Sequence, residues 1–180
     1  MLAAEYISKL TRAWLNVDQV KLELCIDRIY RALINGQLVL TAGNGGSAST
    51  ASHFVNDWAK GLREKTNSPM RAICLSDNIA TITALANDVS YDQIYANQLE
   101  NYMGLKPILI CISGSGNSTN ILSAAVQAKK LGIEVVGLIG FDGGKLIELS
   151  TSYFHCDIND MQIVEDMHLS FGHMVLRRFQ

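Results

Sequence analysis

The stretch "LVLTAGNGGSAST" (residues 38–50) joins a short apolar run to a loop of glycine and serine, and a helical pattern follows. The apolar part predicts a buried strand, and the residues from Ser47 onward predict a helix, with Ser47 near its start as a possible N-cap. Gly43, Gly45 and Gly46 would allow a ligand to approach the backbone closely. A loop between strand and helix is where open α/β sheets bind ligands, at the carboxyl ends of their strands.

The rest of the chain repeats this alternation. Helices are expected at 2–16 and 18–35, the second ending at Asn35-Gly36. Strands are then expected at 37–43, 71–76, 106–113, 134–140 and 153–158, and helices at 47–62, 78–88, 91–103, 117–132, 143–150 and 161–179. The strands are apolar throughout, which is typical of a sheet covered on both faces. The pattern predicts an α/β fold with a parallel sheet.

Composition narrows the class of protein. A length of 180 residues favours one domain, and a net charge of -2 gives no basic field that would attract nucleic acid. No apolar run approaches the roughly 18 residues of a membrane span, and the first residues are too polar for a signal peptide. Four well-separated cysteines, with no CxxC motif, are expected to be buried free thiols in a reducing cytoplasm; they are Cys25, Cys74, Cys111 and Cys156.

A second loop, "SGSGNS" (residues 113–118), follows the third expected strand. It places Ser113, Ser115 and Ser118 around two glycines just before a helix, where unpaired backbone N–H groups attract anions. One such loop would be read as a tight turn with helix caps, but two in equivalent positions favour phosphate binding. A nucleotide is not expected, because the chain has neither a GxGxxG fingerprint nor a P-loop.

Candidate acids, bases and metal ligands lie on two helices. His53 and Asp57 are four residues apart and share a face of the helix that begins at the first loop. Glu165 and His173 lie on the last helix, separated by about 12 Å at 1.5 Å per residue, which argues against both binding one ion directly. His168, between them, is expected to pack or to hydrogen-bond within the fold. Histidine and carboxylate side chains can serve as a base, as an acid and as metal ligands.

The motifs "GNGGSA", "SGSGNS" and "EDMHLSFGH" together resemble those of the sugar isomerase (SIS) domain family, and within it the phosphoheptose isomerases. The resemblance covers nearly the whole chain. It implies one SIS domain over 1–180, with a flavodoxin-like three-layer sandwich of five parallel strands and helices on both faces. It also implies that helices in 1–36 assemble a homotetramer, while 37–180 form the core that binds the sugar phosphate.

The same resemblance assigns roles to individual residues. Zinc, or another divalent metal, would be held by His53, Asp57, Glu165 and His173, with Asp57 as the base and His173 as the acid. The substrate and its phosphate would contact Asn44, Gly45, Gly46, Ser47, Asn87, Asp88, Ser113, Gly114, Ser115, Ser118 and Glu165. Three positions depart from the family pattern, which has Glu at 57, Gln at 165 and Thr at 114.

The activity that the resemblance implies is isomerisation of sedoheptulose 7-phosphate to D-glycero-D-manno-heptose 7-phosphate through an enediol, for nucleotide-heptose and surface polysaccharide synthesis. No nucleotide, nucleic acid or membrane partner is expected. One alternative is a non-catalytic SIS protein that binds a sugar phosphate or associates with the DnaA initiator, motivated by Asp57 and Glu165. A nucleotide-dependent enzyme is a further alternative that fits the fold alone.

Overall fold

The computed structural model describes residues 2–62, 66 and 69–179. Its centre is a parallel sheet in the order β2-β1-β3-β4-β5, which confirms the expected flavodoxin-like arrangement. The strands are β1 (Val39–Gly43), β2 (Ala72–Cys74), β3 (Ile108–Ser113), β4 (Glu134–Gly140) and β5 (Ser152–Cys156). Every residue of β1 and β3 is buried, as the continuous apolar runs predicted.

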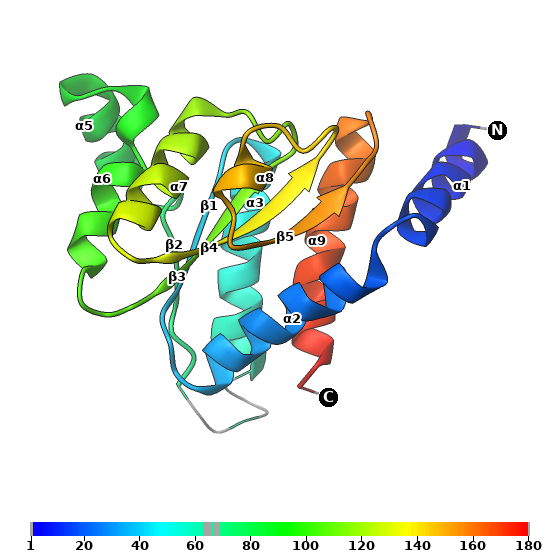
Figure 1. The fold of residues 1–180 in the computed structure, drawn as a ribbon, viewed down its shortest axis with the longest axis horizontal. Coiled ribbons are helices and arrows are strands. Elements are labelled where there is room, and N and C mark those ends of the chain that lie inside the picture. The colour runs from blue at the N-terminus through cyan, green and yellow to red at the C-terminus, as the bar shows by residue number, and fades with distance from the viewer. Residues whose placement is uncertain (1, 63–65, 67–68, 180) are drawn as a thin grey trace.

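Helices cover both faces of the sheet and make three layers (Figure 1). One face is covered by α2 (Gln19–Ile34), α3 (Gly46–Asn56) and α9 (Met161–Arg177), and α1 (Leu2–Leu15) packs against α9. The other face is covered by α5 (Ile79–Asp88), α6 (Ala96–Leu99), α7 (Thr119–Lys130) and α8 (Leu146–Leu149). The core is therefore divided in two by the sheet. Along β3, Ile108 and Ile110 face the first group, and Leu109 and Cys111 face the second.

Helix α3 does not remain α-helical to the end of the segment expected at 47–62. It passes at Asp57 into a π-helical turn (Asp57–Leu62). The backbone N–H of Asp57 still bonds to the carbonyls of His53 and Phe54. Such turns are rare and often occur at functional sites.

Other expected elements differ in their bounds. The helix expected at 91–103 is three short pieces, a 3-10 turn (Tyr91–Gln93), α6 and a second 3-10 turn (Glu100–Tyr102). Here Tyr95 and Gln98 turn their polar groups inward, to the Gly43 carbonyl and to the Leu75 and Ile94 carbonyls. The helix expected at 143–150 is limited to α8, because Gly143 and Gly144 have positive φ angles that a helix cannot contain.

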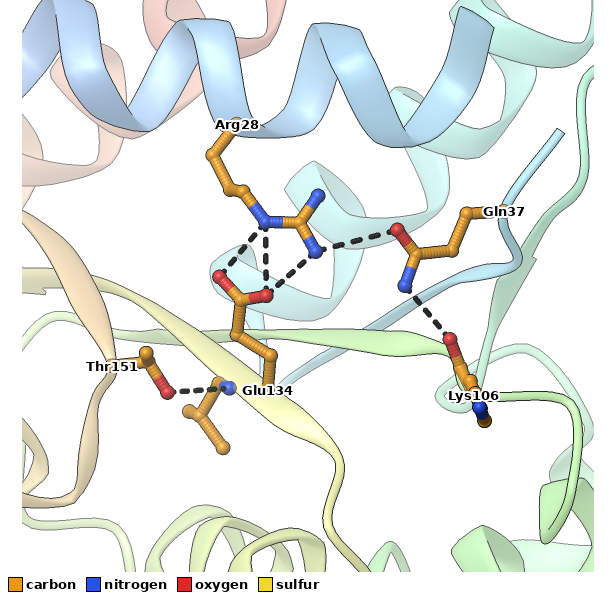
Figure 2. Close-up of polar contacts among 6 residues, drawn as sticks. Arg28, Gln37, Lys106, Glu134 and Thr151 are labelled. Atoms are coloured by element: carbon orange, nitrogen blue, oxygen red, sulfur yellow. Dashed lines mark hydrogen bonds and ion pairs between the residues drawn. The ribbon is translucent and has the colours of Figure 1, made fainter. Parts of the chain in front are cut away.

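Two contacts fix helices on the first face of the sheet. Arg28 on α2 binds Glu134 at the start of β4 through Nε (2.9 Å) and Nη2 (2.6 Å), and Gln37 links Arg28 to the Lys106 carbonyl (Figure 2). On the same face, Gly172 of α9 lies directly over the ring of Phe54 on α3, where a Cβ would overlap the ring. The missing side chain lets the two helices approach closely.

Within the described residues, the helices are all too short or too polar to cross a membrane.

Candidate active site

The two glycine and serine loops meet at one edge of the sheet. Strand β1 pairs with β3 up to the match of Gly43 with Ile112, so the loops that follow the two strands are neighbours. The strand order reverses at this point, because β2 lies on one side of β1 and β3 on the other. Ligands of doubly wound α/β proteins bind in the crevice at this switch point.

The helices that begin at these loops have no side-chain cap. The N-cap of α3 is Gly45 and that of α7 is Ser118, and neither makes a side-chain cap hydrogen bond. By contrast, α2, α5 and α9 are capped by Asp18, Asn78 and Asp160. The first turns of α3 and α7 therefore keep backbone N–H groups for an anion, apart from the N–H of Ile121, which bonds to Asn120 Oδ1.

The sequence suggested Ser47 as a possible N-cap of α3, but the structure shows that it is not the cap. It lies inside the first turn and is buried, because Gly45, with φ at 54°, takes the cap position. The serines of the second loop lie together at the start of α7. Ser113 Oγ is 3.3 Å from Ser118 Oγ, and Ser115 Oγ accepts a hydrogen bond from the Asn117 N–H.

Gly114 stands where the family pattern has threonine, and the side chain of Met161 lies close to it. A Cβ at this position would stand 2.6 Å from Met161 Sδ at the start of α9. The loop is thus packed against a methionine where the family pattern would need space for a larger residue.

A group of three potential metal ligands lies further along α3. His53 Nε2 is 3.2 Å from His173 Nε2 and 3.2 Å from Asp57 Oδ2, and His173 Nε2 is 3.7 Å from that same oxygen. Asp57 is partly buried and the two histidines are exposed. The three side chains come from α3, the π-helical turn and α9, and together they could hold a metal ion. An open groove of about 540 Å³ runs past His53. It is lined by Ala48, Ser49, Ser52, His53, Asn56, Ser76 and Asp77.

Glu165 is not a member of this group among the described residues. Its carboxylate lies against Gly46 in the first turn of α3, where a Cβ would be 2.7 Å from Glu165 Cδ. The structure therefore brings together three of the four expected metal ligands and places the fourth beside the loop that follows β1. The eight-residue separation on α9 explains this, since it puts Glu165 two turns from His173.

Asn87 and Asp88 lie at the end of α5, which contributes no buried residue. Both are exposed, and Asn87 Nδ2 donates to Asp88 Oδ1 (2.7 Å). Among the hydrogen bonds of the described residues, none links this pair to the two loops.

The loop after β1 is held by residues that the sequence did not single out. Asn120 on α7 pairs with Asn44, and the Tyr95 hydroxyl donates to the Gly43 carbonyl (2.5 Å). Ser76 Oγ also donates to the Gly43 carbonyl (2.9 Å). These contacts span up to 76 residues of sequence. In the sequence, the one signal for these contacts was Asn120, which directly follows "SGSGNST" (residues 113–119).

The four cysteines are free and buried, as expected. Burial raises the pKa of Cys25 to about 11 and that of Cys111 to about 12. These thiols are therefore protonated at neutral pH and are not nucleophiles for the site.

Comparisons with known proteins identify the family of this chain. A family model for the SIS domain matches residues 4–140. A probable phosphoheptose isomerase of Thermoplasma acidophilum is 34% identical, and the match covers 96% of this chain and 94% of that protein. A phosphoheptose isomerase of Helicobacter pylori is 36% identical, with 87% of this chain and 81% of that protein covered.

Solved structures show the same fold. A phosphoheptose isomerase from Neisseria gonorrhoeae superposes with a TM-score of 0.84 at 24% identity, covering 98% of this chain and 96% of its own. One from Francisella tularensis gives a TM-score of 0.82 at 28% identity, with 98% and 95% covered. The chain belongs to the SIS domain family, and its relatives identify it as an isomerase of that family.

Proposed function

We propose that this isomerase interconverts sedoheptulose 7-phosphate and D-glycero-D-manno-heptose 7-phosphate through an enediol. The names of its relatives support a phosphorylated heptose as the substrate. The observation that carries the proposal is that one helix, α3, begins at a phosphate-type loop and ends at the His53, Asp57 and His173 group.

The spacing along α3 suits a phosphorylated sugar. Ser47 and His53 are six residues apart, which corresponds to about 9 Å along the helix axis at 1.5 Å per residue. A six- or seven-carbon chain could place its phosphate at the first turn and its carbonyl carbon at the group of three residues. An open groove lies beside α3 at His53, with Ser49 and Ser52 in its lining.

The proton transfers are assigned to two residues. Asp57 would remove the proton from the carbon next to the carbonyl, and His173 would donate a proton to the neighbouring oxygen from the ring nitrogen that does not hold the metal. Asp57 Oδ2 and His173 Nε2 are 3.7 Å apart, so the two side chains can act on adjacent atoms of one substrate. His53 Nε2 lies 3.2 Å from both Asp57 Oδ2 and His173 Nε2, so it stands beside the two groups that would transfer protons.

The same three side chains fit a zinc ion. Ligands at about 2.0–2.1 Å in a tetrahedral zinc site are separated from one another by about 3.3–3.4 Å, and the separations here are 3.2, 3.2 and 3.7 Å. Three protein ligands with a fourth position open are typical of catalytic zinc sites. When bound, the metal would stabilise the negative charge that develops on the substrate oxygen.

The N-terminal helices support a further part of the proposal, assembly into a homotetramer through residues 1–36. Exposed apolar side chains lie along α1 and α2, among them Leu2, Ile7, Leu15, Val20 and Leu24. Burying such side chains between copies is favourable. Light scattering on the purified protein would test this, with a mass of four chains expected and a monomer contradicting it.

We place the reaction in the cytoplasm, upstream of nucleotide-linked heptose for surface polysaccharide. The four buried free thiols suit a reducing compartment.

The experiment is to load the protein with zinc, add sedoheptulose 7-phosphate and follow aldose formation by NMR, with a metal-stripped sample beside it. We expect turnover that depends on the metal. Failure to convert any six- or seven-carbon ketose phosphate would contradict the proposal. If the sugar phosphate still bound, a non-catalytic binding role would replace it, and a pull-down against DnaA would then test that alternative.

A further inference from the structure

Two asparagines join the loops at the carboxyl edge of the sheet. Asn44 Nδ2 donates to Asn120 Oδ1 (2.8 Å), and Asn120 Nδ2 donates back to Asn44 Oδ1 (2.8 Å). Asn44 lies in the loop between β1 and α3, and Asn120 in the first turn of α7, just after the serine loop. The pair is therefore a direct bridge between the segments that would hold the phosphate and the sugar.

The orientation of Asn120 is fixed. Its side chain is 1% exposed, and its Oδ1 also accepts the N–H of Ile121 (2.9 Å). The oxygen is thus occupied by two donors, which leaves the Nδ2 group to face Asn44. A residue at this position must accept and donate at the same time, which the asparagine amide does at every pH and an aspartate does only when it is protonated.

The partner, Asn44, is also held by two tyrosines. Its Oδ1 is 3.3 Å from the Tyr91 hydroxyl and 3.2 Å from the Tyr95 hydroxyl. The Tyr95 hydrogen is directed to the Gly43 carbonyl (2.5 Å), so Asn120 and Tyr91 are the donors to this oxygen, and Asn44 keeps one N–H of Nδ2 for a ligand. The side chain that the sequence assigned to the substrate is therefore presented in one orientation, and Asn120 sets it.

We propose that Asn120 is a positioning residue of this site: it holds Asn44, and with it Gly45 and Gly46, against the serine loop so that the two loops bind one sugar phosphate together. Asn120 itself does not touch the substrate. This inference rests on the proposed function for the identity of the ligand. Its structural part, the coupling of the two loops, is independent of catalysis.

Two substitutions separate the acceptor from the donor role. Asn120→Asp keeps the acceptor toward Ile121 and Asn44 but loses the donor to Asn44 Oδ1 when the carboxyl is ionised. Asn120→Leu loses both. Gln98→Met is the matched control, because Gln98 is also a buried amide, bonded to the carbonyls of Leu75 and Ile94, and does not contact either loop.

Protonation of the carboxyl introduced by Asn120→Asp distinguishes the loss of one hydrogen bond from a general loss of structure. As the pH falls, the carboxyl introduced by Asn120→Asp gains a proton and can again donate to Asn44. The titratable groups on the facing segments are Tyr91, Tyr95 and Asp92, the last bonded to Thr119. Burial raises the pKa of Tyr95, and a nearby carboxylate raises the pKa of another carboxyl, toward this window.

The experiment measures binding of inorganic phosphate and of sedoheptulose 7-phosphate by calorimetry, turnover, and hydrogen exchange of residues 43–48, all between pH 5 and 8. At pH 8 we expect Asn120→Asp and Asn120→Leu to weaken sugar-phosphate binding and raise KM at least tenfold, with a smaller change in kcat. Hydrogen exchange at residues 43–48 should be faster in both variants. Gln98→Met should show the same binding, KM and exchange as wild type. Toward pH 5, Asn120→Asp alone should recover relative to wild type.

The inference is overturned if both Asn120 variants bind and exchange like wild type. It is also overturned if Gln98→Met shows the same losses, or if Asn120→Asp follows Asn120→Leu at every pH. Binding and exchange are read without turnover, so a wild type that binds the sugar phosphate but does not convert it would remove the proposed reaction and leave this test intact.

Discussion

Gly172 and Phe54 are in direct contact where α9 crosses α3, and a Cβ on Gly172 would overlap the aromatic ring. His173, the next residue, reaches His53 Nε2 and Asp57 Oδ2 from this crossing. The distance between the two helices therefore decides whether the group of three potential metal ligands exists. The contact between Gly172 and Phe54 therefore affects both the packing of the core and the position of His173 at the surface.

Replacing Gly172 with alanine should destabilise the protein, although alanine favours a helix by about 1 kcal/mol. The buried Phe54 ring cannot move aside cheaply, and overpacking of a core costs about 1–3 kcal/mol or more. Urea unfolding would measure a net loss of stability, and zinc affinity should fall as well. The matched control is Gly46→Ala, whose Cβ would meet only the flexible end of Glu165 and should cost less. Equal stability of Gly172→Ala and wild type would contradict this view of the helix contact.

The metal site predicts a difference between Glu165 and the other three expected ligands. His53→Ala, Asp57→Asn and His173→Ala each remove one of the converging atoms, and each should weaken zinc binding at least a hundredfold in a competition assay. Glu165→Gln should weaken it less than tenfold, because the carboxylate lies at Gly46. A large loss of zinc in Glu165→Gln would show that Glu165 is a ligand and that its side chain turns toward the metal.

Glu165 should instead affect how tightly the protein binds an anion. Its carboxylate stands at the first turn of α3, where the helix favours negative charge, and a phosphate in this crevice would be repelled by it. We expect Glu165→Gln to bind inorganic phosphate and the sugar phosphate roughly two- to fivefold more tightly, corresponding to about 0.5–1 kcal/mol. Calorimetry at low and high salt would check this, since the difference should shrink with added salt. Weaker binding by the variant would be the contrary result.

His168 predicts how stability depends on pH. Its side chain is buried, neither ring nitrogen has a hydrogen bond of good geometry within the described residues, and burial lowers the pKa of His168 to about 4, against a smaller raising effect of the Ile139 backbone. Between about pH 6.5 and 4 the unfolded chain binds a proton here and the folded chain does not, so stability falls as the pH falls, by about 3 kcal/mol in total. Unfolding of wild type and His168→Leu at pH 6.5, 5.5 and 4.5 would test this. The variant should lose less stability over this range, and parallel losses would argue against it.

Much of the fold could be predicted because it depends on local patterns. The apolar runs of β1 and β3 and the glycines after them fixed the strand-helix alternation, and the spacing of His53 and Asp57 placed them on one face of α3. The N-cap of α3 could not be identified from the sequence, because Gly45 and Ser47 are both suitable residue types and only the backbone conformation distinguishes them.

Other parts of the site depend on contacts that no local pattern contains. Asn44 and Asn120 meet only because β1 pairs with β3, and the turn at Asp57 becomes π-helical within a sequence that reads as an ordinary helix. The position of Glu165 follows from helix geometry, and the 12 Å along α9 that separates it from His173 was visible in the spacing.

The most direct test of the central claim is to compare wild type, Asp57→Asn and His173→Ala, each supplied with zinc and sedoheptulose 7-phosphate, for aldose formation by NMR and for sugar-phosphate binding by calorimetry. The account predicts turnover by wild type, a loss of at least a thousandfold in both variants, and binding retained within about tenfold in all three, because the loops that hold the phosphate are intact. Turnover by either variant at the wild-type rate, or binding without turnover by wild type, would contradict it.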